Sequence, residues 1–182
     1  MSKTFLTLST LMGVVVLTSN YLVQFPIKFY NLEKILTYGA LSYPVAFLIT
    51  DLANRYYGKL IARKIVYVGF FIGISFTFFF STNFSDLISI RIAIGSGVAF
   101  LISQLLYVQI FHKLRKKKWF IAPLTSSSLG SIVDTFLFFS ISFYGTGISW
   151  ITLSLGDLTV KFLVALLMLI PFRLLMGNFK AA

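Results

Sequence analysis

The sequence predicts an all-α integral membrane protein with six transmembrane helices and both termini in the cytoplasm. Three observations support this prediction. The 182 residues are 58% hydrophobic and only 12% charged, about half the charged fraction of a soluble domain. Six stretches of the chain approach or exceed the roughly 20 apolar residues that a helix needs to cross a bilayer. The basic residues gather in every second loop, as the cytoplasmic loops of membrane proteins do.

The predicted spans cover about residues 4–25, 35–54, 64–84, 87–111, 119–143 and 151–175. Turn residues separate them, among them Pro26, the STNFSD segment at 81–86 and the YGTG segment at 144–147. No A-x-A cleavage site precedes Pro26, so we expect the first apolar stretch to be a retained helix and not a signal peptide. No segment is long or polar enough for a soluble domain. Residues 1–182 are therefore expected to form a single six-helix transmembrane domain.

The distribution of basic residues predicts the orientation. The side that holds both termini carries twelve of them: Lys3, Arg55, Lys59, Arg63, Lys64, Lys113, Arg115, Lys116, Lys117, Lys118, Arg173 and Lys180. The other side carries only Lys28 and Lys34. Cytoplasmic loops carry the excess of basic residues, so we expect a multi-pass protein of the inner (plasma) membrane with both termini inside. The net charge of +11 then reflects loops near lipid headgroups, and no nucleic-acid partner is expected.

Enzymatic chemistry is not expected from this composition. The chain has no cysteine, and its single histidine, His112, lacks companions for a metal site. It has no G-x-x-x-x-G-K-[ST] loop for nucleotide phosphates. The SLGD segment at 154–157 differs from the G-x-G-D of intramembrane aspartyl proteases because Ser154 replaces the first glycine. We therefore expect no catalytic residues, no cofactor and no metal.

Buried polar residues are the main functional signal. Asp157 and Lys161 lie well inside the last predicted span, where a lone charge costs roughly 2.5–3.5 kcal/mol. At 1.5 Å per residue, Asp134 and Arg91 fall in the same outer half of the membrane. These groups must pair with one another or face a wet cavity. Gln104 lies about 220° around its helix from Arg91, so both cannot face one pocket without a distortion.

Helical spacing places further polar residues on shared faces. The sets are Ser154, Asp157 and Lys161; Pro123, Ser127, Gly130, Ser131 and Asp134; Asn20 and Gln24; and Tyr43, Phe47 and Asp51. Structural interpretations remain open for each. Asp157 and Lys161 can form an ion pair that only holds the bundle together. The small residues of IAIGSGVAF and TSSSLGS suit helix packing. Asp51 and Asn54 can cap or anchor the inner end of their helix.

Several segments together carry a family resemblance: TSNYLVQFPI (18–27), YGALSYPVAFLITDLANRYYGKLIARK (38–64), RIAIGSGVAFLISQLL (91–106), WFIAPLTSSSLGSIVDTFLFFSISFYG (119–145) and GDLTVKFLVALLMLIP (156–171). In this order they resemble the queuosine precursor transporter family, of the vitamin uptake transporter type. The resemblance is greatest to its 7-cyano-7-deazaguanine branch and covers nearly the whole chain. It implies uptake of a small deazapurine across the inner membrane, for salvage into queuosine in tRNA.

The resemblance and the polar faces give a set of candidate substrate-binding residues. They are Asn20, Gln24, Tyr43, Phe47, Asp51, Arg91, Gln104, Asp134, Asp157 and Lys161. Asp134 or Asp157 is expected to accept the adjacent N–H donors of the base, and an aromatic side chain to cover its flat ring. One departure matters: members usually have an acid where this chain has Tyr107, which weakens any expectation of ion coupling at that position.

Two other functions stay open on the sequence alone. The chain could be the substrate-binding subunit of an ATP-driven importer that needs partner subunits. It could also be a structural membrane protein whose buried charges fix helix packing without any ligand. An oligomer of identical chains is compatible with either.

Overall fold

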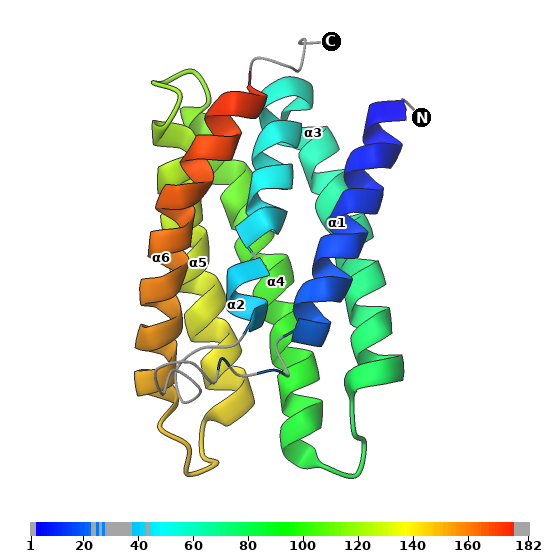
Figure 1. Cartoon of the computed structure of the whole chain (residues 1–182). Coiled ribbons are helices and arrows are strands. Elements are labelled where there is room, and N and C mark those ends of the chain that lie inside the picture. The colour runs from blue at the N-terminus through cyan, green and yellow to red at the C-terminus, as the bar shows by residue number, and fades with distance from the viewer. Residues whose placement is uncertain (1–2, 23–24, 26, 28–37, 43, 177–182) are drawn as a thin grey trace.

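The structure is a computed structural model that describes residues 3–22, 25, 27, 38–42 and 44–176. Within these residues it is entirely helical. The elements in chain order are α1 (Lys3–Leu22), α2 (Tyr38–Ser42), α3 (Pro44–Phe76), the π-helix η2 (Thr77–Ser81), α4 (Leu87–Leu114), α5 (Ile121–Phe143) and α6 (Trp150–Leu175). Figure 1 shows that the long helices run roughly parallel or antiparallel to one another in a bundle. The all-α prediction is therefore confirmed for the described part of the chain.

The longest helix, α3, contains the turn between two predicted spans. Gly58 interrupts it with φ 78° and ψ 177°, a backbone conformation that is open essentially to glycine alone. In Figure 1 the part of α3 that follows α2 runs toward the end of the bundle where α1 begins, and the later part runs back. The sequence predicted a loop over residues 55–63. The chain instead remains helical on both sides of one glycine.

Four helices of the described chain are long and apolar enough to cross a membrane: Pro44–Phe80, Leu87–Leu114, Ile121–Phe143 and Trp150–Leu175. This is two fewer than the six predicted spans. The helix continues through the kink at Gly58, so two predicted spans count as one. The first predicted span corresponds to α1, within which the stretch Phe5–Ser19 is apolar. The count of six stays a prediction, whereas the last three predicted spans match α4, α5 and α6 within three residues.

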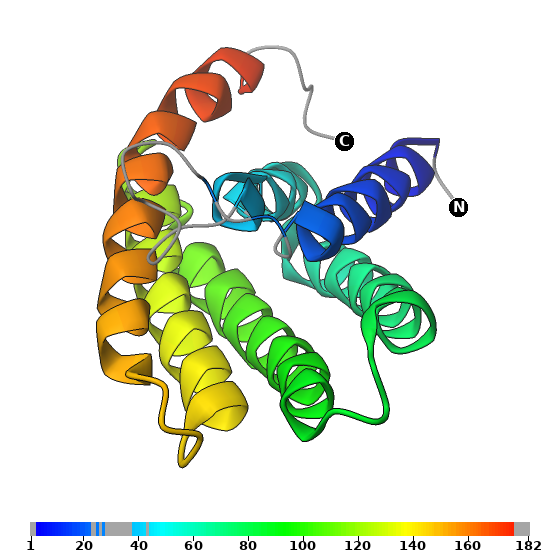
Figure 2. The ribbon, with the colours of Figure 1, turned by 60° about the horizontal axis from the view of Figure 1, so that its bottom comes forward.

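The helices form two neighbouring groups. Figure 2 shows α4, α5 and α6 in a row, with the later part of α3 beside α4 and α1 against α3. The first part of α3 lies between these groups and contacts α4 and α6. The start of α1 and the end of α6 lie at the same end of the bundle.

Glycines allow the closest helix contacts. A Cβ atom at Gly95 of α4 would lie 2.6 Å from Ser142 Oγ of α5, and one at Gly69 of α3 would lie 2.5 Å from Met12 Cγ of α1. Any larger residue would push these helices apart. The expectation that the small residues of IAIGSGVAF serve helix packing is thus confirmed at Gly95.

Two apolar clusters hold the bundle on either side of its polar centre. The first joins α1, α3 and α4 through residues such as Met12, Ile65 and Val108. The second joins α3, α4, α5 and α6 near the end where α6 finishes, and includes Phe111 and Phe172. The polar side chains described next lie between α3, α4, α5 and α6.

Candidate functional site

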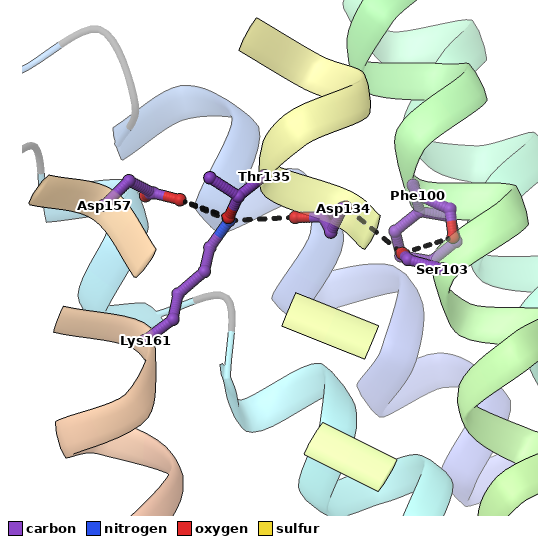
Figure 3. A network of polar contacts seen from close by, with 6 residues as sticks. All are labelled: Phe100, Ser103, Asp134, Thr135, Asp157 and Lys161. Carbon is purple, nitrogen blue, oxygen red and sulfur yellow. Dashed lines mark hydrogen bonds and ion pairs between the residues drawn. The ribbon is translucent and has the colours of Figure 1, made fainter. Parts of the chain in front are cut away.

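Lys161 of α6 lies at the centre of a buried ionic cluster. Its Nζ lies 2.9 Å from Asp134 Oδ2 on α5 and 2.6 Å from Asp157 Oδ2 one turn earlier on α6. The nitrogen also donates to Thr135 Oγ1 at 3.0 Å. These contacts use all three N–H donors of the ammonium group. Figure 3 shows the lysine reaching from α6 toward α5 between the two carboxylates.

Hydroxyl groups complete the hydrogen bonds of the two acids. Thr135 Oγ1 donates to Asp157 Oδ2 at 2.8 Å, and Ser103 Oγ of α4 donates to Asp134 Oδ1 at 3.2 Å. The network therefore runs from α6 through α5 to α4, as the dashed lines of Figure 3 trace. Such donors stabilise ionised carboxylates away from water. Two carboxylates and one ammonium give the cluster a net charge of −1 when all three are ionised.

Helix geometry explains how the sequence builds this cluster. Residues four apart on a helix face the same side, which brings Asp157 and Lys161 together on α6. The predicted small and polar face of α5 is buried along its whole length, with Pro123, Ser127, Gly130, Ser131 and Asp134 all inside the bundle. The tight approach of α5 that these small residues allow brings Asp134 within reach of α6 and α4.

A pocket adjoins this cluster. It is lined by Pro44, Phe47, Leu48, Asp51, Tyr107, Ser127, Ser131, Lys161, Ala165 and Met168, which come from α3, α4, α5 and α6. The centre of a water molecule can move within only about 20 Å³ of it, enough for one or two waters. A bicyclic base therefore fits only after the walls move apart. The lining is apolar with a few convergent polar groups, as small-molecule sites generally are.

The pocket has an aromatic wall. The rings of Phe47 and Tyr107 stack with centroids 4.7 Å apart and planes at 19°. Gly130 lies directly against this wall, because a Cβ atom there would lie 3.1 Å from Tyr107 Cδ2. Both rings are almost fully buried. Phe47 was one of several aromatic residues that the sequence offered to cover a flat ligand, and the structure places it in the pocket.

Asp51 lies in this pocket and not at a helix end. Its exposed fraction is 4%, and its Oδ1 has no hydrogen-bond partner in the described part of the chain. The hydroxyl of Tyr107 lies near Asp51 and is also buried. It makes no hydrogen bond of normal geometry in the described part of the chain. Because α3 continues seven residues to Gly58, Asp51 does not cap the helix as the structural interpretation had it. Asn54 is the anchor, donating to the backbone oxygen of Val108 at 2.8 Å.

Gln104 lies on the face of α4 that contacts α3. Its side chain is fully buried, and its Oε1 accepts a hydrogen bond from Thr50 Oγ1 at 3.2 Å. Its Nε2 has no partner among the described residues. Gln104 thus contacts α3 at Thr50, the residue before Asp51, but it is not part of the pocket lining.

Arg91 lies elsewhere. Its Nε donates to the backbone oxygen of Ile141 at 2.9 Å and its Nη2 to that of Tyr144 at 2.8 Å. These contacts satisfy backbone oxygens at the end of α5, where helical carbonyls lack partners. The structure therefore does not bring Arg91 to Lys161, although their depth in the membrane had suggested that they converge.

Three candidates cannot be placed in the site. Gln24 and Tyr43 lie outside the described residues, and Asn20 is described only as part of the last turn of α1. Nearby, Ser19 of α1 and Ser42 of α2 share a hydrogen bond of 2.9 Å. The helices α1 and α2 therefore meet at this point.

Sequence reasoning did not include Ser103 and Thr135 among the candidates. Thr135 follows Asp134 directly and so lies about 100° around α5 from it, away from the polar face that was recognised. Ser103 directly precedes Gln104, and only Gln104 was among the candidate residues. Their contribution depends on the packing of α5 against α4 and α6, a relationship that spacing within one helix does not reveal. Among the described residues no three metal-ligating side chains come together.

Comparisons with known proteins find relatives over most of the chain. A family model described as "Putative vitamin uptake transporter" matches residues 37–176. The chain is 34% identical to a "Probable queuosine precursor transporter" of Haemophilus influenzae, over 86% of this chain and 79% of that protein. It is 30% identical to the "Queuosine precursor transporter" of Escherichia coli K12, over 87% of this chain and 79% of that protein. No solved structure matches the chain significantly.

Proposed function

The chain belongs to the family of vitamin uptake transporters, and from this premise we propose that it imports a queuosine precursor across the inner membrane. It is a multi-pass membrane protein and a transporter, not an enzyme. The observation that carries the proposal is its similarity, over most of its length, to relatives named as queuosine precursor transporters. The imported base would enter the salvage route for modified tRNA.

The proposed substrate is 7-cyano-7-deazaguanine or a close deazapurine. Such a base has a flat ring, adjacent N–H donors on its guanidine-like edge and a carbonyl oxygen beside them. The stacked rings of Phe47 and Tyr107 offer a wall for the flat ring. A carboxylate can accept the two adjacent donors in bidentate fashion. These features support a neutral bicyclic base over a sugar, a peptide or an inorganic ion.

We assign the donor edge of the base to Asp134 or Asp157. In the structure both acids pair with Lys161, so a base can reach one of them only by replacing the ammonium. The lysine, which also lines the pocket, would then donate its released N–H to the carbonyl oxygen of the base. This exchange keeps the donors and acceptors that take part in it paired, which matters where an unpaired polar group costs several kcal/mol. It gives the cluster a role beyond holding α5 to α6.

We further propose that residues 1–182 form one domain that crosses the membrane six times with both termini in the cytoplasm. The turn of α3 at Gly58 supports two crossings within that helix. The excess of basic residues at the end of the bundle where α6 finishes supports the orientation.

Thermal stabilisation of the purified protein tests the substrate class. A ligand that binds only the folded state raises the melting temperature in a saturable way. We expect 7-cyano-7-deazaguanine to do so and adenine, which lacks the guanidine-like edge, to have no effect. Equal shifts with both bases, or none with any deazapurine, would contradict the assignment.

A further inference from the structure

The pocket contains more negative charge than the ionic cluster compensates. Lys161 already pairs with two carboxylates, and Asp51 brings a third to the same pocket. No ion pair to Asp51 exists within the described residues, and its Oδ1 has no hydrogen-bond partner there. An ionised carboxylate buried in this way costs several kcal/mol, so the group binds a proton or another cation instead.

The groups around Asp51 determine whether it binds a proton or another cation. The polar groups that face it are Tyr107 from α4, Ser127 and Ser131 from α5, and Lys161 from α6, with Asp134 and Asp157 behind the lysine. On its own helix, Arg55 donates to the backbone oxygen of Arg115 and so is turned to another partner. The described parts of α1 and α2 carry no charged residue after Lys3.

A proton fits these surroundings better than a metal ion. A calcium or magnesium ion needs about six oxygen ligands or more. Besides Lys161, only one carboxylate and three hydroxyl groups line the pocket. A proton needs only the lone pair of Oδ1, and it turns that atom from an unpaired acceptor into a donor.

We propose that Asp51 is a proton-binding site in this pocket, and that its proton moves inward with each imported base. A proton taken from water on the outer side forms an O–H bond at Asp51 Oδ1 and is released to water on the cytoplasmic side. The first half of this inference stands on the geometry alone, whereas the second half rests on the proposed function. The two ligands are coupled because the base displaces Lys161 from a carboxylate and so changes the charge that faces Asp51.

Infrared spectroscopy of the purified full chain, without ligand and at neutral pH, tests the first half. We expect the carbonyl stretch of a protonated carboxyl group in the wild type and its loss in Asp51→Asn. Asn is nearly isosteric with a neutral Asp, so this variant should fold, and Asp51→Glu should restore a shifted band. The matched control is Asp86→Asn, because Asp86 is exposed and caps α4 through Ile88 and Ser89, and Asn is about as favourable as Asp at the N-cap of a helix. Absence of the band in the wild type, or its survival in Asp51→Asn, would overturn the site.

Proteoliposomes of the wild type and of Asp86→Asn test the second half. Addition of 7-cyano-7-deazaguanine should acidify the lumen, and an outside pH one unit lower should drive about tenfold accumulation, since one unit corresponds to a tenfold ratio for one proton. A protonophore should abolish both effects. Base uptake without either effect would overturn the coupling and leave the proposed function standing. No uptake under any condition, with the infrared band present, would reject the proposed function and leave the proton site standing.

Discussion

Lys161 Nζ and Asp134 Oδ2, 27 residues apart in the sequence, lie 2.9 Å from each other and join α6 to α5 inside the bundle. Asp157 shares the same ammonium, so the removal of Lys161 leaves two buried carboxylates without a cation. The cluster therefore has consequences for both stability and transport, and the two can be separated by experiment.

Lys161→Met should lower the free energy of unfolding by about 3–5 kcal/mol, the usual effect of breaking a buried ion pair. Thermal unfolding in detergent measures this, with Lys113→Met as the control because Lys113 is exposed at the end of α4. The triple variant Lys161→Met, Asp134→Asn, Asp157→Asn should recover most of the loss, since it leaves no unpaired charge. A single lysine variant as stable as the control would show that the cluster is not buried as described.

Asp134→Asn should abolish uptake of the base while the protein still inserts and folds. The amide keeps the size of the carboxylate but presents one oxygen acceptor and one NH₂ donor group. It therefore cannot accept both adjacent N–H groups of the base in bidentate fashion. Uptake into cells that express each variant measures the effect, with Asp86→Asn as the control. Normal uptake by Asp134→Asn would remove this residue from the proposed site and leave Asp157 as the acceptor.

Gly130→Ala should weaken binding of the base by narrowing the pocket. The added methyl group would lie 3.1 Å from Tyr107 Cδ2 and 3.8 Å from Phe47 Cε1, and so would press on the aromatic wall. We expect several-fold weaker binding, on the order of 1 kcal/mol, which is typical of mild overpacking. Leu129→Ala is the matched control, because Leu129 is exposed on the outside of α5. Equal affinity in the two variants would mean that the base does not contact this wall.

Gly58→Ala should destabilise the protein by about 1–3 kcal/mol, because its φ of 78° and ψ of 177° strain any residue with a Cβ atom. The substitution makes little steric contact otherwise, since the nearest atom outside the helix, Arg115 Nη1, would lie 3.5 Å from the new Cβ atom. Thermal unfolding, with Lys59→Ala as the control, measures the effect. A neutral result would show that α3 does not turn at this residue.

Single-cysteine labelling should establish the orientation of the protein in the membrane. Because the sequence has no native cysteine, only the introduced residue can react. Ser85 and Lys117 are exposed in connections at opposite ends of the bundle. We expect an impermeant thiol reagent to label Ser85→Cys from outside intact cells and Lys117→Cys only after the membrane is opened. The reverse pattern would contradict cytoplasmic termini, and labelling of both from one side would contradict the six crossings.

Much of this arrangement could be predicted from the sequence because membrane helices follow simple spacing rules. The spans that became α4, α5 and α6 are apolar runs between clear turn residues, and the pairing of Asp157 with Lys161 follows from their separation by one helical turn. The buried face of α5 also follows from its pattern of small and polar residues.

The remainder depends on contacts between helices. Asp51 was placed at an inner helix end beside Arg55, because the sequence predicted a loop there. A single glycine makes the turn instead, so the helix runs on and Asp51 lies in the pocket with Tyr107. Arg91 was grouped with the acids by depth alone, yet its position around α4 directs it to the end of α5. Depth along a helix can be counted from a sequence, whereas the neighbour that each face meets cannot.

Uptake of labelled 7-cyano-7-deazaguanine by proteoliposomes that contain only this chain tests the central claim most directly. The account predicts saturable uptake that unlabelled deazapurine suppresses, that Asp86→Asn retains and that Asp134→Asn loses. Binding without uptake would instead indicate a subunit that needs an ATP-driven partner. Neither binding nor uptake by a well-folded sample would contradict the account and leave the buried charges with a structural role alone.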